Sequence, residues 1–414
     1  MEINVIRLRT VLDNREEEII KNNDAFLDAI NDELFSDDLV LLEDSLHAAF
    51  DIYFVETGGS ETKFLEHFDN LKAPVVLLSN GQNNSLPASL EIKTYCSLHD
   101  IPAVILTGDE KKIAGVLKPL ARAIVARDSL KGNNLGLVGE PSDWLISSQV
   151  SDEDAKNIFG INLIHISMEE FKNEIDKNEL VKIPHLGDLK DKFKDSQVLD
   201  GACSIYSALK RLIAKYDLQG LTVRCFDLLG TYKNTACLAL ALLNEEGITA
   251  TCEGDVPSML TMHLVRALTG RSSFQANPSY FNQEKNTVLF AHCTLPLNMT
   301  SDYTLTTHFE SGLGIGIKGD LHLGEVTVCK VFINQKHNLD NCVALQGNIK
   351  ENLSLQNYCR TQINIEFSQY DLMSILREDF GNHMIICYGD IVDDFYSLIS
   401  LLNYEVTKTL DKSC

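Results

Sequence analysis

The sequence predicts an α/β protein with two doubly wound parallel-sheet domains and then an antiparallel, barrel-like domain. Short apolar runs separated by stretches with helical spacing predict the parallel sheets, because a strand that is buried on both faces reads as an unbroken apolar run. Consecutive strand-like segments after about residue 297, almost without helical spacing, predict the barrel-like domain. We expect domain boundaries of 1–134, 135–296 and 297–414.

The first domain is predicted from three apolar runs, each of which ends in a turn that contains glycine. These expected strands are 51–56, 74–78 and 101–106, and helical spacing follows at 86–98 and 111–125. Repeated alternation of strand and helix indicates a parallel sheet with helices on both faces.

The same alternation restarts after the polar turn at 131–134. The expected strands are 135–138, 162–166, 221–226, 247–252 and 287–291, and the expected helices are 202–216, 234–243 and 255–269. The last helix starts at Asp255 and stops at Gly270, which are typical cap residues. We expect 287–291 to be the last strand of a second parallel sheet.

The third domain is predicted from strand-like segments joined by short turns. These are 303–308, 313–318, 324–333 and 342–349, and helical spacing returns only at 371–376 and 393–409. Frequent glycine and β-branched residues favour antiparallel strands here.

The net charge of −23 excludes whole classes of partner. Such a chain repels phosphate backbones and anionic membranes, so we expect neither nucleic acid nor a membrane as a partner. An anionic ligand would need a local basic pocket to overcome this field. The chain has no membrane-length apolar stretch and no signal-peptide pattern at its start, so we expect a cytoplasmic protein. The eleven cysteines lack regular spacing, and we expect them to be reduced and buried.

Reactive residues follow the predicted strands of the second domain. Asp227, Glu253 and His292 each come at or just after a strand end, and Asp255 is two residues further on. Because ligands bind beyond the carboxyl ends of parallel strands, these side chains should share one edge. Carboxylate and neutral imidazole together suit a divalent ion such as Mn²⁺, Mg²⁺ or Zn²⁺.

Each of these residues also has a structural interpretation. Asp255 has the position of a helix N-cap, Asp227 also suits a cap or a turn, and His292 also suits a hydrogen-bonded core histidine. Glu253 is the hardest to explain structurally, because a buried carboxylate is costly unless it is paired or bound to metal.

Several segments resemble the L-fucose and L-arabinose isomerases over about residues 135–395. The similar segments are Val223-Arg224-Cys225-Phe226, Cys252-Glu253-Gly254-Asp255-Val256, Leu260-Thr261-Met262, Leu268-Thr269-Gly270, Ala291-His292-Cys293, Thr307-His308-Phe309-Glu310-Ser311-Gly312, Gly324-Glu325-Val326-Thr327, Gly381-Asn382-His383 and Tyr388-Gly389-Asp390. The order and spacing of these segments together are more specific than any one of them.

The resemblance implies a metal-dependent aldose–ketose isomerase that converts a small sugar through an ene-diol, with manganese as the expected metal. Carried over by position, Glu253 would be a ligand and the catalytic group, and His292 and His383 would be ligands. The resemblance also implies a homo-oligomer, a trimer or a hexamer.

One position departs from the family pattern, because Asn277 stands where the second acidic ligand is expected. An amide oxygen can still bind a hard cation but cannot carry a proton. Either Glu253 works alone, or a neighbour such as Asp255 or Asp227 assists, or the chemistry has changed. The alternative function is therefore a sugar-binding or regulatory relative without isomerase activity. A third possible function is that of an extracytoplasmic sugar-binding protein built from two doubly wound domains. The missing signal pattern and the β-rich third domain oppose it.

Four further residues are candidates for sugar binding. His308 and Glu310 are two apart on an expected strand face, which would point either to a pocket or to solvent. Trp144 is the single tryptophan and follows a strand-to-helix turn, where it would either stack on a sugar or enter the core. Asp227 is the fourth.

Overall fold

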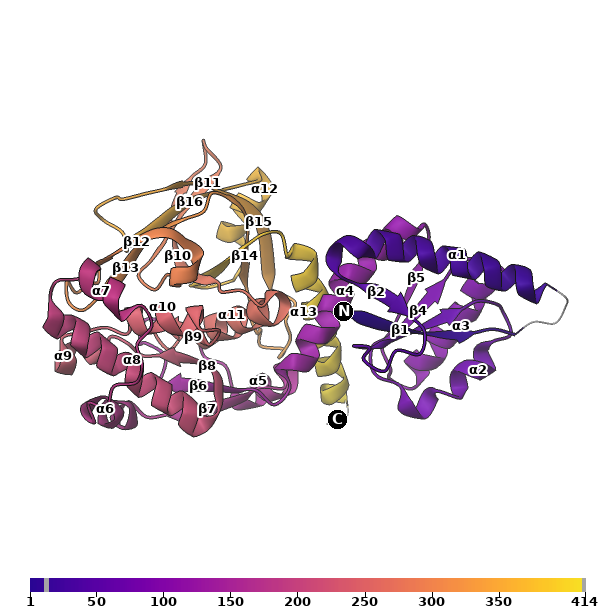
Figure 1. The fold of residues 1–414 in the computed structure, drawn as a ribbon, viewed down its shortest axis with the longest axis horizontal. Coiled ribbons are helices and arrows are strands. Elements are labelled where there is room, and N and C mark those ends of the chain that lie inside the picture. The colour runs from indigo at the N-terminus through magenta and orange to yellow at the C-terminus, as the bar shows by residue number, and fades with distance from the viewer. Residues whose placement is uncertain (11–14, 412–414) are drawn as a thin grey trace. The chain divides into compact units, whose positions relative to one another are not determined.

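The computed structural model describes residues 1–10 and 15–411, with side chains up to residue 404. The chain folds as two compact units, built mainly from Met1–Val125 and from Ala126–Thr409 (Figure 1). The predicted fold class is confirmed, because two parallel sheets with helices are followed by a closed antiparallel barrel. The predicted boundaries at residues 134 and 296 stay predictions.

Unit 1 is a five-stranded parallel sheet with strand order β2-β1-β3-β4-β5. Its strands are β1 (Glu2–Leu8), β2 (Val40–Leu42), β3 (Asp51–Val55), β4 (Val75–Ser79) and β5 (Ala103–Thr107), and its helices are α1 (Glu16–Leu34), α2 (Glu61–Leu65), α3 (Ser85–Leu98) and α4 (Glu110–Leu130). The three predicted strands are present. The sequence analysis missed β1 and β2, because polar residues such as Asn4 and Arg7 interrupt the apolar run of β1.

Unit 2 begins with a four-stranded parallel sheet of order β7-β6-β8-β9. Its strands are β6 (Asn134–Val138), β7 (Asn162–Ile166), β8 (Leu218–Val223) and β9 (Thr249–Cys252). Its helices are α5 (Asp152–Phe159), α6 (Met168–Asp176), α7 (Leu186–Lys192), α8 (Ser196–Tyr216), α9 (Asp227–Tyr232), α10 (Cys237–Glu245) and α11 (Val256–Thr269). The predicted caps of α11 are confirmed, because Asp255 accepts a hydrogen bond from the Ser258 amide and Gly270 is left-handed.

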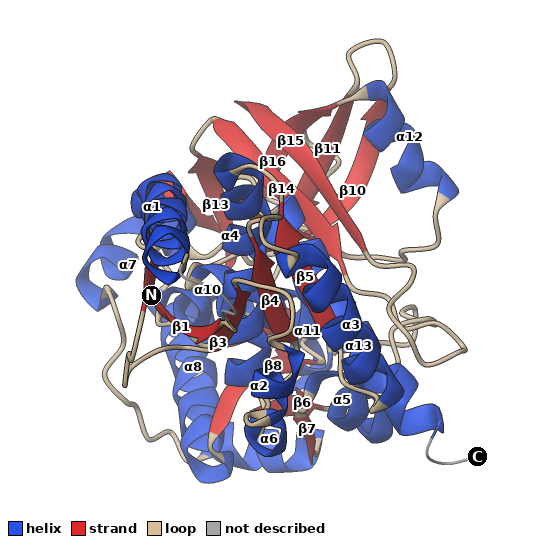
Figure 2. Cartoon of the chain, turned by 90° about the vertical axis from the view of Figure 1, so that its right-hand side faces the viewer, coloured by secondary structure: helices blue, strands red, loops and turns tan. Residues whose placement is uncertain are grey.

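A six-stranded closed barrel completes unit 2, in the order β10-β11-β16-β15-β14-β17 (Figure 2). Its strands are β10 (Phe274–Asn282), β11 (Thr287–His292), β14 (Gly324–Lys330), β15 (Val343–Asn352), β16 (Thr361–Phe367) and β17 (Met384–Tyr388). Beside it, β12 (Thr300–Thr306) and β13 (Gly316–Leu321) form a separate antiparallel pair. Helices α12 (Gln369–Arg377) and α13 (Val392–Asp411) are near the positions predicted for them.

The assignment of 287–291 to the second parallel sheet is wrong. This segment is β11, which pairs antiparallel with β10 on one side and β16 on the other. The barrel therefore begins before residue 297, at Phe274. An unbroken apolar run shows that a strand is buried, but it does not show which strand lies beside it.

Two helices connect the parallel sheet of unit 2 to its C-terminal strands. α11 contacts β8 and β9 of the sheet and also β14 and β17 of the barrel, while α10 contacts β9 and β13. Figure 1 shows α10 and α11 between the two sets of strands. The carboxyl end of β9 thus faces the barrel.

The described cysteines are all free, and all except Cys359 are buried, as the sequence analysis expected. Among the described residues, no helix combines the length and the apolar character that crossing a membrane requires.

Candidate metal centre

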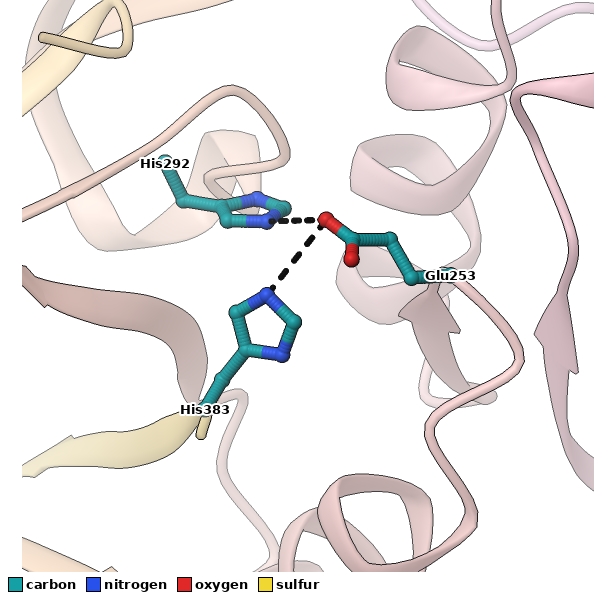
Figure 3. Close-up of side chains that lie close together, drawn as sticks. All are labelled: Glu253, His292 and His383. Carbon is teal, nitrogen blue, oxygen red and sulfur yellow. Dashed lines mark ion pairs between the residues drawn. The ribbon is translucent and has the colours of Figure 1, made fainter. Parts of the chain in front are cut away.

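Three side chains from separate parts of unit 2 converge on one point. Glu253 follows β9, His292 is the last residue of β11, and His383 directly precedes β17. Oε1 of Glu253 lies 3.5 Å from Nε2 of His383 and 3.9 Å from Nε2 of His292 (Figure 3). One ligand atom from each residue lies within 4.8 Å of the others, so the three could hold a metal ion. The predicted convergence is present, although His292 comes from the barrel and not from the parallel sheet.

The Glu-Gly-Asp sequence fits the shape of the backbone after β9. Glu253 and Gly254 both have positive φ, at 68° and 69°. A Cβ atom on Gly254 would lie 2.7 Å from the carbonyl oxygen of Glu140, so only glycine fits against that loop. The same loop holds Glu253 directly, because the Ser142 amide donates to the Glu253 carbonyl oxygen at 2.9 Å.

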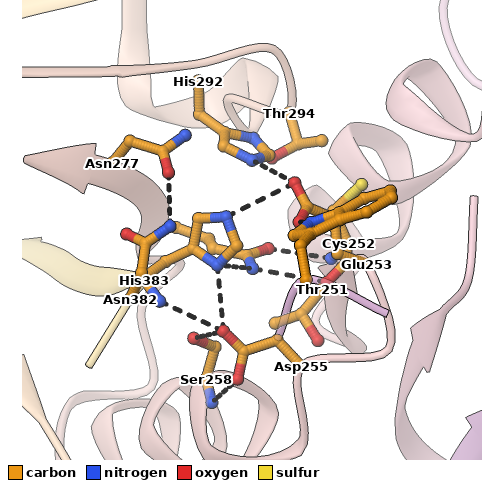
Figure 4. A network of polar contacts seen from close by, with 12 residues as sticks. Thr251, Cys252, Glu253, Asp255, Ser258, Asn277, His292, Thr294, Asn382 and His383 are labelled. Atoms are coloured by element: carbon orange, nitrogen blue, oxygen red, sulfur yellow. Dashed lines mark hydrogen bonds and ion pairs between the residues drawn. The ribbon is translucent and has the colours of Figure 1, made fainter. Parts of the chain in front are cut away.

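Asp255 fixes the orientation of His383 from behind. Its Oδ2 accepts from Nδ1 of His383 at 2.9 Å and from the His383 amide at 3.1 Å (Figure 4). An ionised carboxylate only accepts hydrogen bonds, so the proton of the neutral imidazole sits on Nδ1 and the lone pair on Nε2. In the neutral ring, Nε2 therefore carries the lone pair that a metal ion would bind, whereas in the protonated ring the same nitrogen carries a proton that faces Glu253.

A buried lysine supports Asp255 in turn. Nζ of Lys330 lies 3.6 Å from Oδ2 of Asp255 and donates to Oγ of Ser258 at 2.9 Å. Oγ of Ser258 donates to the same carboxylate oxygen at 2.6 Å. Lys330 and Asp255 are almost completely buried, at 1% and 0% exposed, so each charge depends on the other.

The other two members of the cluster are also held. Nδ1 of His292 lies 2.9 Å from Oγ1 of Thr294, which leaves Nε2 facing Glu253. Nε1 of Trp144 donates to Oε2 of Glu253 at 2.6 Å. Glu253 therefore directs one carboxylate oxygen to Trp144 and the other to the histidines.

The cluster shifts the protonation of its own members. Burial raises the pKa of Glu253, but the two histidines outweigh this and bring it well below its usual range. Burial lowers the pKa of His383, but Asp255 and Glu253 outweigh burial and raise it to about 9. Burial lowers the pKa of His292, and Glu253 offsets only part of that effect. In Asp255, the charges of Lys330 and His383 overcome burial and lower the pKa.

One buried atom indicates that a cation fits here. Nε2 of His383 is buried and has no hydrogen-bond partner among the described residues. Leaving such an atom unpaired is costly. One carboxylate and two imidazoles match the preferences of Mn²⁺ and Zn²⁺, and the hydrogen bond from His383 to Asp255 is the usual second contact of a metal-binding histidine.

Asn277 lies at the wall of the cluster, on β10, but its amide is engaged elsewhere. Its Oδ1 accepts from Nδ2 of Asn382 at 2.5 Å (Figure 4). Its Nδ2 donates to the Ala291 carbonyl oxygen at 3.4 Å. Asn382 and Ala291 immediately precede His383 and His292 in the sequence. The amide thus links the two segments that carry the histidines. Its expected role as a metal ligand stays a prediction.

Trp144 is not a core residue, although the start of a helix was the structural interpretation for it. It lies in a turn, and its side chain is 54% exposed. Its ring packs edge-on against Phe226 at 4.9 Å, and Phe226 packs in the same way against His308 at 5.5 Å. These three rings form an aromatic wall beside Glu253, and Trp144 and His308 are two of the predicted sugar-binding residues.

The expected strand face of His308 and Glu310 is wrong. β12 ends at Thr306, and both residues lie in the turn before β13, where Nδ1 of His308 contacts Oγ of Ser311 at 3.0 Å. Glu310 is nevertheless near the cluster: burial raises its pKa, and the charge of Glu253 raises it further.

Asp227 is not a member of the cluster of Glu253, His292 and His383. It is the first residue of α9, where its carboxylate accepts from Nε of Arg224 at 3.2 Å. Both residues line a different cavity of about 460 Å³, at the carboxyl ends of β6, β7 and β8.

Sequence reasoning missed the residues that support the cluster from behind, above all Lys330, Ser258 and Thr294. Lys330 carries a signal that could have been used, because a lysine ends the apolar strand Gly324–Lys330. A charged residue in such a run calls for a buried partner. Ser258 and Thr294 give no comparable signal in the sequence.

Comparison with known proteins supports a relationship to sugar isomerases. No protein-family model matches the chain. The sulfoquinovose isomerase of Priestia aryabhattai is 23% identical over 380 residues, which cover 84% of this chain and 82% of that protein. The sulfoquinovose isomerase of Alkalicoccus urumqiensis is 22% identical over 342 residues, which cover 79% and 76%. The resemblance to fucose and arabinose isomerases is thus supported at the broader level of sugar isomerases.

Proposed function

We propose that this chain is a metal-dependent aldose–ketose isomerase that acts on a small sugar. One observation carries the proposal: the unpartnered, buried Nε2 of His383 faces the carboxylate of Glu253, in a chain similar to sugar isomerases. Glu253, His292 and His383 would hold a divalent ion, with Mn²⁺ as the expected metal. Assembly into trimers or hexamers stays a prediction.

The reaction moves one proton between two neighbouring sugar carbons. When bound, the ion supplies a Lewis acid that polarises the sugar's oxygen atoms. A carboxylate of the protein removes the proton from C2 of the aldose while O1 gains a proton, which gives the ene-diol. The carbon-bound proton then returns at C1 while O2 loses its proton and becomes the carbonyl oxygen of the ketose. We assign this task to Glu253, whose Oε2 accepts from Trp144 and which lies beside the aromatic wall.

Asp255 is unsuited to share this proton transfer, although it was one of the neighbours expected to assist Glu253. It is 0% exposed, and its two oxygens accept from Ser258 and His383. We assign it the role of holding His383. We prefer Glu310 for this role, because it is more exposed than Asp255 and because burial and the charge of Glu253 raise its pKa.

Asn277 was the feature that favoured a relative without isomerase activity. The hydrogen bonds of its amide give a different interpretation, in which Asn277 holds the backbones that carry both histidines. A neutral amide suits that position, because it both accepts and donates. Proton transfer then depends on Glu253 and Glu310 and not on residue 277.

Metal content and proton exchange test the proposal together. Purified protein should carry one divalent ion per chain, and a calorimetric titration with Mn²⁺ should show the same stoichiometry after the metal is stripped. Loaded protein in D₂O should exchange the C2 proton of its substrate, which NMR detects. Sulfoquinovose is the first sugar to test, because the relatives act on it by name, and unmodified aldohexoses and aldopentoses follow.

Two variants and a matched control make the result specific. Glu253→Gln should lose most of its Mn²⁺ affinity and all turnover. Glu310→Gln should lose turnover but keep its Mn²⁺ affinity. Glu284→Gln is the control, because Glu284 is exposed in the β10–β11 turn. Equal Mn²⁺ affinity in wild type and Glu253→Gln would contradict the proposed site.

A further inference from the structure

Arg360 is a cation beside the candidate metal centre that the proposed proton transfer does not use. It directly precedes Thr361, the first residue of β16, which pairs with His292 on β11. Its side chain reaches the turn between β12 and β13, where Nε donates to the Thr307 carbonyl oxygen at 2.7 Å and Nη2 donates to Oγ1 of Thr307 at 3.1 Å. The backbone of Arg360 is therefore next to a proposed metal ligand, and its guanidinium is held by the turn that carries Glu310.

The aromatic wall connects this turn to Glu253. Thr307 directly precedes His308, which forms one end of the wall. Trp144 forms the other end, and its Nε1 donates to Glu253. Burial lowers the pKa of His308 to about 4, and the charges of Glu253 and Arg360 both act on this ring as well. The wall thus extends from the carboxylate that we assign to proton removal to the turn that holds Arg360.

The positive charge of Arg360 is not balanced by a carboxylate of the described residues. Its two hydrogen bonds go to uncharged oxygens, and its guanidinium lies 5.7 Å from the centre of the Phe309 ring, which is also uncharged. Arg224, which is also close to the wall, differs because Asp143 and Asp227 pair with it at 3.0 and 3.2 Å. A guanidinium has more N–H donors than the two hydrogen bonds of Arg360 use. Arg360 therefore keeps both charge and donors for a ligand.

We propose that Arg360 binds the oxyanion group of a sulfonated or phosphorylated sugar, at the end of the substrate that is distant from C1 and C2. This inference rests on the proposed isomerase and names the substrate class of that site. Sulfonate and phosphate both present tetrahedral oxygens to which a guanidinium donates charge-assisted hydrogen bonds. Because Thr307 already holds the guanidinium, Arg360 loses less entropy on binding than a free side chain would.

The aromatic wall gives the sugar its direction. The apolar C–H face of a sugar packs on aromatic rings, so a sugar whose C1 and C2 are at Glu253 would extend along the wall towards Arg360. A chain with a net charge of −23 repels an anionic sugar, and one unbalanced cation counteracts this repulsion locally. Glu310 is exposed on the same turn, and it opposes an anion when it is ionised.

A purely structural role for Arg360 predicts a different result. If Arg360 only holds the turn at Thr307, its removal should weaken the binding of every sugar alike. If Arg360 binds the oxyanion, its removal should weaken the binding of anionic sugars only. The ratio of the affinities for anionic and neutral sugars therefore separates the two roles.

Calorimetry on the full chain measures this ratio with three probes: sulfoquinovose, glucose 6-phosphate and glucose. The titrations use the Glu310→Gln chain in excess Mn²⁺, so that turnover adds no heat. At least one anionic sugar should bind about tenfold or more tightly than glucose. A preference for sulfoquinovose alone supports a sulfonate ligand, a preference for glucose 6-phosphate alone supports a phosphate ligand, and a preference for both supports recognition of the oxyanion group that they share.

Substitutions in this background test the residue. Arg360→Gln should remove the preference for the anionic sugar, leave the affinity for glucose unchanged and not weaken Mn²⁺ binding. Arg360→Lys should keep part of the preference, because it keeps the charge but loses the two-pronged contact with Thr307. Arg377→Gln is the matched control and should keep the preference in full, because it removes the same charge from an exposed position in the last turn of α12, which follows the opposite end of β16.

Three outcomes overturn the proposal: no anionic sugar binds more tightly than glucose, Arg360→Gln keeps the preference, or Arg360→Gln weakens the binding of glucose and of anionic sugars by the same factor. A failure of the proposed isomerase looks different. It appears as missing Mn²⁺ binding or missing C2 proton exchange in wild type, while the preference and its dependence on Arg360 remain.

Discussion

Replacing Asp255 by asparagine tests how the candidate metal centre is held together. The carboxylate has two tasks that one substitution removes at once. It balances the charge of Lys330 at 3.6 Å, and it accepts the proton on Nδ1 of His383 at 2.9 Å. The asparagine has nearly the same shape but no charge, and its NH₂ group meets donors where the carboxylate accepted.

The two tasks predict separate losses. Removing one partner of a buried ion pair costs about 3–5 kcal/mol of stability, because the other charge stays buried without compensation. Loss of the hydrogen bond behind a metal-binding histidine typically lowers metal affinity about 10–100-fold. Adding Lys330→Met to Asp255→Asn removes the isolated charge, so stability should return to within about 2 kcal/mol of wild type. Metal affinity should stay low in this double variant.

Unfolding in urea followed by tryptophan fluorescence measures the first loss, because Trp144 is the single tryptophan and lies in unit 2. Calorimetric titration with Mn²⁺ measures the second. Wild-type stability in Asp255→Asn would refute the charge pairing. Full Mn²⁺ affinity in the double variant would refute the claim that Asp255 orients His383.

Three further predictions use the same two measurements. Asn277→Asp should tighten Mn²⁺ binding, because it adds a negative charge at the wall of the cluster, and unchanged affinity would show that residue 277 lies outside the field of the ion. The affinity of wild type for Mn²⁺ should rise about tenfold per pH unit up to about pH 9, where metal and proton stop competing for His383; a plateau near pH 6.5 would contradict this. Burial lowers the pKa of His263 to about 4 in the folded chain. As the pH falls below about 6.5, the unfolded chain therefore binds a proton at this residue while the folded chain does not. Through this residue, the free energy of unfolding should drop by about 3 kcal/mol between pH 7 and pH 4. In His263→Gln the drop should be smaller by that amount. An equal drop in wild type and variant would refute the lowered pKa of His263.

Several features of this protein followed from local sequence alone. Unbroken apolar runs identified buried parallel strands such as 74–78, which the structure places at Val75–Ser79. The start of α11 at Asp255 and its end at Gly270 were also local, because a cap needs only a side chain or a glycine next to the helix end. Glu253 stood out for a similar reason, since a carboxylate directly after a buried strand needs a partner.

Only the tertiary structure decided which partners those residues meet. The apolar run 287–292 suited either kind of strand, and its pairing with β10 and β16 moved it into the barrel together with His292. Asp255 and His383 are 128 residues apart, and their contact depends on α11 packing against β17. Lys330 reaches Asp255 through the packing of α11 against β14. Periodicity reports whether a side chain is buried, but the identity of its neighbour is set by chain closure over long distances, which no local rule specifies.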